Sequence, residues 1–262
     1  MNPFFFGSRD RALYGVYHPP RVQGGGRGPV GRDGVVLCYP FGVEYMRAHR
    51  AFRQLTTLLT RQGLHVLRFD YYGTGDSMGE GAEADLTGWT GDVEMAIQEL
   101  RDTAGLARVG LIGLRLGGAL AARAAVGRDD VDRLVLWDPV VSGSHYLASL
   151  PGAPFAGGFP AGVDAVGVGG FPVTRSFYQQ LHGFELDTSD VPARVRVELI
   201  TSRRDPEFDR LRERLAVRTG PQHVDMVPSE GNWAEGDAFG SALLPQGIIQ
   251  AIVDRFSGVG SP

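Results

Sequence analysis

One segment of the sequence combines a strand pattern, a glycine-bounded turn and a side chain suited to chemistry. Residues 108–120 form a short apolar run, then the turn Gly113-Leu-Arg-Leu-Gly117, then a series of small residues. Glycines at this spacing permit a sharp strand-to-helix turn with close packing. A guanidinium stays charged and has no lone pair to offer, but it donates several hydrogen bonds from one point. Arg115 is therefore suited to binding a carboxylate, an enolate, a quinone oxygen or a phosphate.

The composition excludes several functional classes. The chain has 262 residues, of which 43% are hydrophobic and 21% charged, which predicts one globular domain over 1–262. A net charge of -4 and the lack of a basic patch argue against nucleic acid. The apolar runs are only strand-sized, so we expect no membrane span and a cytoplasmic location. The sequence leaves monomer and homodimer open.

No residues are spaced as metal ligands, and the dinucleotide-binding fingerprint is absent, so we expect neither a metal nor a cofactor. All 26 basic residues are arginine, which excludes a Schiff base on lysine. The single cysteine, Cys38, lies within an apolar run and is expected to be a small core residue. A small-molecule substrate is the expected partner.

Short apolar runs alternate with helical patterns from residue 35 onward, which predicts an α/β protein with a mostly parallel, twisted sheet and helices on both faces. The expected strands are 35–39, 65–70, 108–112, 133–138, 195–201 and 223–227. One helix should end at Gly63, and the others should span 86–102, 116–126, 206–219 and 242–256. Residues 4–17 predict an N-terminal antiparallel hairpin that turns near 8–10, and residues 24–34 predict a surface loop.

The stretch 142–192 interrupts this alternation and predicts a lid insertion. It is rich in glycine and has a short helical pattern over 174–182. A solvated loop is disfavoured because several large aromatic side chains would be costly to leave in water: Phe155, Phe159, Phe171, Phe177 and Tyr178. We therefore expect this segment to cover a pocket.

The turn at Arg115 resembles the nucleophile elbow of the α/β-hydrolase superfamily, Gly-x-Ser-x-Gly, with arginine in place of serine. Asp70-Tyr-Tyr-Gly-Thr-Gly-Asp-Ser-Met-Gly and Tyr39-Pro-Phe-Gly resemble two further loops of that family. Together with Leu136-Trp-Asp-Pro-Val-Val-Ser-Gly, the pattern is similar to bacterial serine-aminopeptidase-like and exosortase-associated hydrolases. The resemblance covers most of the chain outside 142–192 and implies the α/β-hydrolase fold.

The resemblance also implies site positions. Asp205 stands where the family acid often lies, whereas Asn232 stands where the family has its histidine. His223 is expected at the wrong end of the sheet. The backbone N–H groups of Phe41 or Gly42 and of Leu116 would form an oxyanion hole. Because two of the three triad positions differ, acyl-serine hydrolysis is not expected.

Residues that follow parallel strands face the ligand crevice of such a sheet. They are Phe41, Glu44, Tyr45, Tyr71, Tyr72, Asp138, His145, Tyr146 and Trp233. Their aromatic content suggests a pocket for a large, flat or hydrophobic substrate.

Each polar candidate also has an ordinary structural role. His145 would titrate near neutral pH or simply pack, and Asp138 would act as a second acid or cap a turn. For Glu44 we favour helical pairing with Arg47 or Arg50. Arg115 would face a ligand, or close the site by pairing with Asp205 or Asp138.

Three hypotheses follow. The first is a non-hydrolytic enzyme of specialised metabolism in which Arg115 stabilises an oxyanion on a bulky aromatic or polyketide-like carbonyl compound, with Asp205, Asp138 or His145 moving protons. Bond formation, cyclisation, epoxide opening or isomerisation would fit. The second is a catalytically silent pseudo-hydrolase that binds a ligand or partner. The third is an esterase, thioesterase or peptidase with a displaced nucleophile, Ser77 or Ser144.

Overall fold

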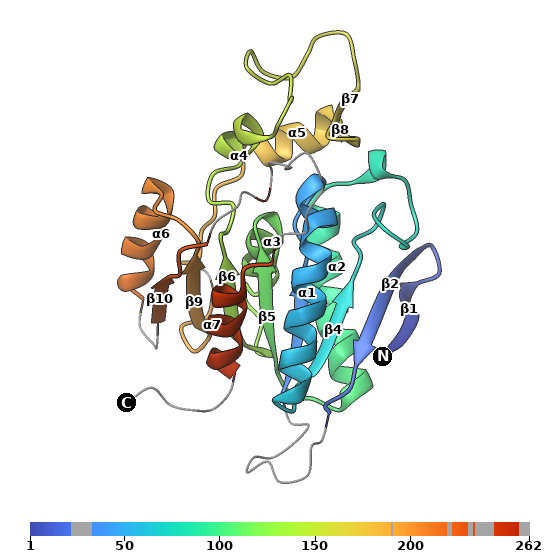
Figure 1. Ribbon diagram of the computed structural model, residues 1–262. Coiled ribbons are helices and arrows are strands. Elements are labelled where there is room, and N and C mark those ends of the chain that lie inside the picture. The colour runs from blue at the N-terminus through green and yellow to red at the C-terminus, as the bar shows by residue number, and fades with distance from the viewer. Residues whose placement is uncertain (22–32, 190, 219–221, 230–232, 234–243, 257–262) are drawn as a thin grey trace.

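The central feature of the computed structural model is an eight-stranded sheet in the order β1-β2-β4-β3-β5-β6-β9-β10 (Figure 1). The structure describes all residues except 22–32, 190, 219–221, 230–232, 234–243 and 257–262. Six neighbouring strands of this sheet are mutually parallel: β4, β3, β5, β6, β9 and β10. The β1–β2 hairpin joins the edge of β4 antiparallel. The strands are β1 (Asn2–Ser8), β2 (Arg11–His18), β3 (Gly34–Cys38), β4 (His65–Phe69), β5 (Val109–Leu114), β6 (Val131–Trp137), β9 (Arg196–Thr201) and β10 (Gln222–Met226).

Helices cover both faces of this sheet. In Figure 1, α1 and α7 lie in front of it and contact each other, whereas α2 and α3 lie behind it and form a second contacting pair. Helix α6 packs on β9 and β10. The bounds are α1 (Val43–Arg61), α2 (Leu86–Ala104), α3 (Leu116–Ala124), α6 (Pro206–Ala216) and α7 (Gln246–Phe256), with a 3-10 turn, η1 (Gly81–Glu83).

The expected mostly parallel sheet, its six parallel strands and the N-terminal hairpin are confirmed, with strand limits that differ by one or two residues. Strands β3 and β5 are buried along their whole length because helices cover both faces, which explains their continuous apolar sequences. Cys38 is fully buried there, as expected. Three helix limits were overestimated: α3 ends at Ala124, α6 ends at Ala216, and α7 begins at Gln246. Most of the predicted loop 24–34 lies outside the described residues.

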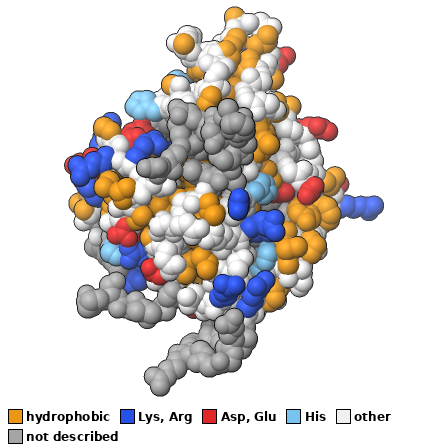
Figure 2. Space-filling view, viewed as in Figure 1, with side chains coloured by type: hydrophobic (Ala, Val, Ile, Leu, Met, Phe, Trp, Pro, Cys, Tyr) orange, Lys and Arg blue, Asp and Glu red, His pale blue; other side chains and the backbone are white. Residues whose placement is uncertain are grey.

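The segment 142–192 leaves the sheet after β6 and returns to it at β9. It contains helix α4 (Gly143–Ser149), the hairpin β7 (Ala165–Val168) and β8 (Phe171–Thr174), and helix α5 (Arg175–His182), of which only α5 is clear from sequence. These elements lie above the carboxyl ends of the parallel strands (Figure 1). Phe155, Phe177 and Tyr178 are buried, and Figure 2 shows hydrophobic side chains on the projection that the segment forms. None of the described helices is long and apolar enough to cross a membrane.

The edge between β2 and β4 provides a pH-dependent contribution to stability. Burial, reinforced by the charge of Arg68, lowers the pKa of His18 to about 4. The Arg68 guanidinium lies 3.3–3.4 Å from Nε2 of His18, which suits a neutral imidazole that accepts a hydrogen bond. As the pH falls, His18 therefore binds a proton at a higher pH in the unfolded chain than in the folded protein. The contribution of His18 is present above its unfolded pKa of about 6.5 and is lost as the pH falls toward 4.

We expect His18→Gln to reduce the acid sensitivity of folding, because glutamine can accept a hydrogen bond from Arg68 but does not titrate. Urea unfolding of both proteins at pH 7 and pH 4.5 measures the effect. The wild type should lose more of its free energy of unfolding between these two pH values than the variant does. Equal losses would show that His18 is not linked to folding.

Candidate functional site

The turn between β5 and α3 holds Arg115 in a backbone conformation that side chains rarely adopt. Its φ is 54° and its ψ is -120°, and its N–H donates to the carbonyl of Trp137 at 3.0 Å. The flanking glycines are required by close backbone approach. A Cβ on Gly113 would lie 2.3 Å from the carbonyl oxygen of Gly117, and one on Gly117 would lie 2.2 Å from that of Cys38. Strained residues of this kind cluster at functional sites, where surrounding structure holds them.

A buried network fixes the Arg115 side chain. Its Nε donates to Oε1 of Glu44 at 2.9 Å, and its Nη1 donates to the main-chain carbonyl of Asp138 at 3.2 Å. The other oxygen of Glu44 accepts from the hydroxyl of Tyr146 at 2.9 Å. The guanidinium carbon also lies 5.4 Å from the centre of the Tyr146 ring. Three segments of the chain, at the starts of α1, α3 and α4, are joined in this way.

The electrostatics keep this network charged. Burial alone would lower the pKa of Arg115, but the Glu44 carboxylate and its neighbours outweigh burial, so the pKa lies above its ordinary value. Glu44 lies in the first turn of α1, where the helix dipole favours a negative charge. Burial, with the charge of Glu44, raises the pKa of Tyr146 well above its ordinary value. Tyr146 therefore stays protonated and serves as a hydrogen-bond donor to Glu44.

Arg115 retains hydrogen-bonding capacity. A guanidinium has five N–H groups, and within the described part of the chain the two bonds above are those that Arg115 donates. The side chain is 10% exposed and lines a cavity of about 190 Å³. The cavity walls also include His145, Tyr146, Arg203, Asp205 and Glu207. The remaining N–H groups can therefore bind an anionic or carbonyl oxygen in that cavity.

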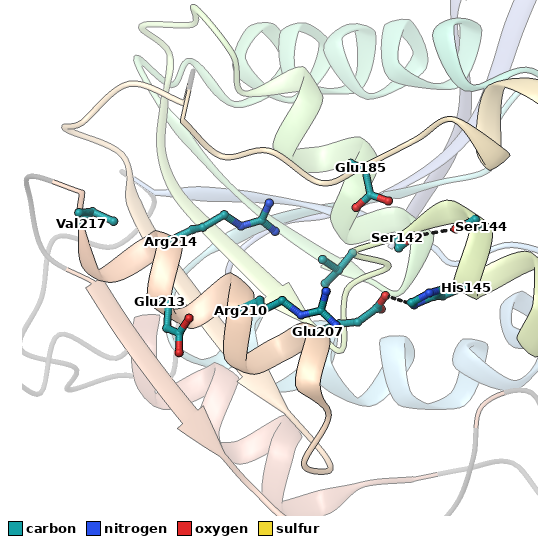
Figure 3. Close-up of a pocket in the computed structure, with 10 residues that line it drawn as sticks. Ser142, Ser144, His145, Glu185, Glu207, Arg210, Glu213, Arg214 and Val217 are labelled. Atoms are coloured by element: carbon teal, nitrogen blue, oxygen red, sulfur yellow. Dashed lines mark hydrogen bonds and ion pairs between the residues drawn. The ribbon is translucent and has the colours of Figure 1, made fainter.

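A second, larger cavity of about 630 Å³ adjoins the first and shares Ser142, His145 and Glu207 with it (Figure 3). Nδ1 of His145 and Oε1 of Glu207 are hydrogen-bond partners at this boundary. Asp205 caps the N-terminus of α6 by accepting from the N–H of Glu207 at 3.0 Å. Asp205, Glu207 and His145 are thus the carboxyl and imidazole groups among the residues that line the Arg115 cavity.

Two expected ion pairs are wrong in their partners. Glu44 binds Arg115 instead of Arg47 or Arg50, and Arg115 binds Glu44 instead of the carboxylates of Asp205 or Asp138. The reason is that Glu44 lies on the buried side of α1, away from solvent. Asp138 contributes its carbonyl, while its Oδ1 accepts from the N–H of Ser202 at 2.7 Å.

Asp138 does not line either cavity, so its expected role as a second acid is not supported by its position. It is fully buried with a φ of 41°, and its Oδ2 has no hydrogen-bond partner in the described chain. Burial raises its pKa, partly offset by the hydrogen bonds from Ser202. Its structural role is to join the ends of β6 and β9.

Several expected contact residues have other partners and do not line the two cavities. Tyr45 donates to Oδ1 of Asp70 at 2.7 Å, and the Tyr72 ring stacks under the guanidinium of Arg11. Phe41 is buried against Trp89, Phe171 and Phe177.

The two other expected oxyanion-hole residues, Gly42 and Leu116, begin α1 and α3 beside the turn, but neither belongs to the lining of the two cavities. Of the aromatic candidates, Tyr146 alone lines the cavity at Arg115, since it lies on α4 above the sheet.

The region after β10 is only partly described. Asn232 lies outside the described residues. Trp233 is buried against Trp137, and its carbonyl accepts from Arg47 at 3.1 Å. His223 pairs in register with Glu198 near the start of β10, at the sheet end opposite Arg115, as the sequence predicts. Within the described ranges no three His, Cys, Asp or Glu side chains are grouped as a metal site requires.

Sequence reasoning missed Glu44 as the partner of Arg115 and Glu207 as the partner of His145. A signal for Glu44 existed: it continues the apolar stripe of α1 through Ala48, Phe52 and Leu55, so a buried carboxylate needing a partner was indicated. Glu207 gave no such signal, because its partner lies 62 residues away and the two meet only in the folded chain.

Comparisons with known proteins agree with this architecture. The family model "Serine aminopeptidase, S33" matches residues 44–160, which include Glu44, Arg115 and Tyr146. A search of curated proteins finds no match.

Three solved structures are similar over nearly their full length. Est1E from Butyrivibrio proteoclasticus, bound to ferulic acid, has a TM-score of 0.70 at 13% identity and covers 97% of this chain and 96% of its own. The α/β hydrolase GrgF from Penicillium sp. sh18 has a TM-score of 0.67 at 14% identity, covering 97% and 96%. Mouse α/β hydrolase domain-containing protein 10 has a TM-score of 0.59 at 18% identity, covering 98% and 97%.

At these identities the structural likeness establishes the fold, and the family model adds a match to the central part of the sequence. The order of the strands, the strand–turn–helix at Arg115 and the N-terminal hairpin agree with this fold. The chain has the α/β-hydrolase fold, and its residues 44–160 are similar to the serine aminopeptidase S33 family model.

Proposed function

We propose that Arg115 occupies the position of the hydrolase nucleophile and binds an oxyanion in place of attacking a carbonyl. The protein is then a non-hydrolytic enzyme that acts on a bulky aromatic or polyketide-like carbonyl metabolite. The observation that carries the proposal is that Arg115, whose guanidinium is fixed by Glu44 and the Asp138 carbonyl, donates only two hydrogen bonds among the described residues and is one of the residues that line the smaller cavity. Preorganised donors of this kind stabilise charge that develops in a transition state.

The chemistry follows from the groups around the cavity. A substrate carbonyl that gains negative charge as an enolate or alkoxide accepts hydrogen bonds from Arg115, which stays protonated throughout. Asp205 or the His145–Glu207 pair takes or returns the proton, because these groups line the same cavity. Bond formation, cyclisation, epoxide opening and isomerisation each need this combination of an oxyanion donor with a nearby acid or base.

Cavity size supports a substrate that spans both compartments. About 190 Å³ is smaller than an ordinary ligand site, whereas the adjoining cavity of about 630 Å³ lies within the usual range. The carbonyl end would enter the smaller cavity at Arg115, and the remainder would extend past His145 into the larger one. The segment 142–192 would act as the lid, since α4 supplies His145 and Tyr146 from above.

A catalytically silent binding protein is the second candidate. One observation favours it: the Arg115–Glu44 pair is nearly sealed from solvent, with side-chain exposures of 10% and 1%. Such a pair can simply close a former active site. Reproducible chemical conversion of any substrate by the purified protein would exclude this candidate.

Hydrolysis through a displaced serine is disfavoured by the surroundings of Ser77 and Ser144. The Ser77 hydroxyl donates to the carbonyl of Asp70 at 2.6 Å and accepts from the N–H of Tyr14, so the main chain occupies it. Ser144 contacts the hydroxyl of Ser142 at 3.0 Å. Nδ1 of His145 is engaged by Glu207, and no hydrogen bond links this histidine to Ser144.

We therefore expect a serine-directed fluorophosphonate to leave the protein unmodified, since an unactivated hydroxyl is a weak nucleophile. Intact-mass spectrometry of the wild type and of Ser144→Ala after incubation with the reagent checks this. An adduct on the wild type that disappears in Ser144→Ala would contradict the proposal and establish Ser144 as a nucleophile.

A further inference from the structure

The larger cavity has a positively charged wall that the proposed chemistry at Arg115 does not use. Arg210 and Arg214 lie one turn apart on α6 and both line this cavity. In Figure 3 their guanidinium groups extend from α6 toward the cavity. Arg212, on the same helix, does not line it and instead pairs with Asp209 at 3.0 Å. Helix α6 thus directs two of its arginines to the cavity and uses a third in a surface ion pair.

Neither guanidinium has an ion-pair partner among the described residues, although hydrogen bonds from Ser189 and, to a smaller extent, the charge of Arg214 lower the pKa of Asp187, which does not line this cavity. Among the described residues, Arg214 donates no hydrogen bond and forms no ion pair, and the bond that Arg210 donates runs from Nε to the carbonyl of Pro206 at 3.3 Å. Like charges one helical turn apart repel each other, although water screens this repulsion because both side chains are exposed. An anion bound between them would relieve this repulsion and accept several charge-assisted hydrogen bonds.

Three carboxylates line the same cavity, but none of them forms an ion pair with Arg210 or Arg214. Glu207 is engaged by His145, and Glu213 points away from the guanidinium groups in Figure 3. Glu185 lies across the cavity from Arg214 in the same view, and no ion pair within 4.0 Å joins it to either arginine. A ligand with an anionic end and a neighbouring hydroxyl or amine would bind the two arginines through its anionic end and Glu185 through the hydroxyl or amine.

We propose that Arg210 and Arg214 bind a carboxylate or phosphate group on the distal arm of the substrate. This inference rests on the proposed function, because Arg115 binds the other end of the same molecule. The two cavities share Ser142, His145 and Glu207, so one extended ligand can occupy both. The substrate class is thereby narrowed to carbonyl compounds that carry an acidic tail.

The first test uses the minimal anion, inorganic phosphate, and does not depend on Arg115. Phosphate at constant ionic strength should raise the Tm of the wild type, of Glu44→Leu/Arg115→Met, which lacks Arg115 without leaving Glu44 unpaired, and of the matched control Arg212→Gln. The Tm increase should be smaller in Arg210→Gln/Arg214→Gln than in the wild type, because two anion-binding groups are removed while Arg115 remains. An equal Tm increase in Arg210→Gln/Arg214→Gln, or none in the wild type, would contradict the anion site.

The second test uses chromophoric phenols that carry an arm. The probes are (4-hydroxy-3-nitrophenyl)alkanoic acids with arms of two, four and six carbons and the neutral amides of these acids. A third set has the same nitrophenol and the same arms but ends in a phosphate. For at least one length the wild type and Arg212→Gln should bind an acidic probe at least about 10-fold more tightly than the amide, which corresponds to one charge-assisted hydrogen bond or more. Comparing the carboxylate and phosphate tails shows which anion is preferred.

The variants separate the two claims. In Arg210→Gln/Arg214→Gln the acid and the amide should bind alike, whereas Arg115→Met should weaken both probes. A preference for the acid that survives in the double variant would overturn the inference and leave the proposed function standing. Probe binding that is unaffected by Arg115→Met would overturn the proposed function alone. The failure of every probe to bind the wild type would contradict both.

Discussion

Replacing Glu44 by leucine is expected to lower the free energy of unfolding by about 3–5 kcal/mol, because the Arg115 charge is left buried without its partner. Glu44 is 1% exposed and holds both Arg115 and the Tyr146 hydroxyl, so one substitution removes the acceptor of two buried donors. Urea unfolding at pH 7 measures the loss. As a matched control, Asp209→Ala breaks the exposed pair with Arg212 and should cost less than about 1 kcal/mol.

The double variant Glu44→Leu/Arg115→Met shows what the pair contributes to folding. Replacing both members of a buried ion pair by apolar side chains is often neutral or stabilising. We expect the double variant to recover most of the stability that Glu44→Leu loses. Recovery would mean that folding does not require the pair. A double variant as unstable as Glu44→Leu, or a loss below about 1 kcal/mol in the single variant, would contradict this account of the buried network.

The second large effect concerns chemistry. Once a substrate is identified by mass-spectrometric screening of acidic aromatic carbonyl compounds, Arg115→Lys should lower kcat by about 10²–10³-fold, the usual cost of losing one oxyanion donor. Lysine can keep the ion pair with Glu44. Its single ammonium group cannot also donate to the Asp138 carbonyl and to a ligand in the cavity, as the several nitrogens of a planar guanidinium can.

Steady-state kinetics and a circular dichroism melt of the same preparations separate catalysis from folding. Arg212 is an exposed arginine that pairs with Asp209 and lines neither cavity, so Arg212→Lys is the matched control. Its kcat should change by less than about 10-fold, since no hydrogen bond is removed from the Arg115 network. Arg115→Lys with an undiminished kcat would show that the guanidinium has no part in the transition state.

Much of the fold can be predicted because its signals are local. Strands such as β3 and β5 are continuous apolar runs, and Gly113 and Gly117 mark the turn that their close packing requires. The hairpin β7–β8 was not predicted, because a glycine-rich stretch with short alternations gives neither a helical nor a strand period.

The candidate site was predictable only in part, because its partners are distant in sequence. Arg115 and Tyr146 follow strand ends, and the position of a strand end in a parallel sheet can be inferred from sequence. The choice of Glu44 over Asp205 as the partner of Arg115 depends on which face of α1 is buried at the top of the sheet. Glu44 and Arg115 are 71 residues apart in the sequence. Tyr45, one residue further along the same helix, turns to Asp70 instead.

The most direct test of the central claim is the pKa of 4-nitrophenol bound to the protein, read from its absorbance during a pH titration. A phenolate beside the Arg115 guanidinium gains an opposite charge within hydrogen-bonding distance, so its pKa should fall by about 1 unit or more relative to free 4-nitrophenol. The fall should be absent in Arg115→Met and present in Arg212→Lys. A bound pKa equal to that of the free phenol, or an equal shift in Arg115→Met, would show that Arg115 does not bind oxyanions.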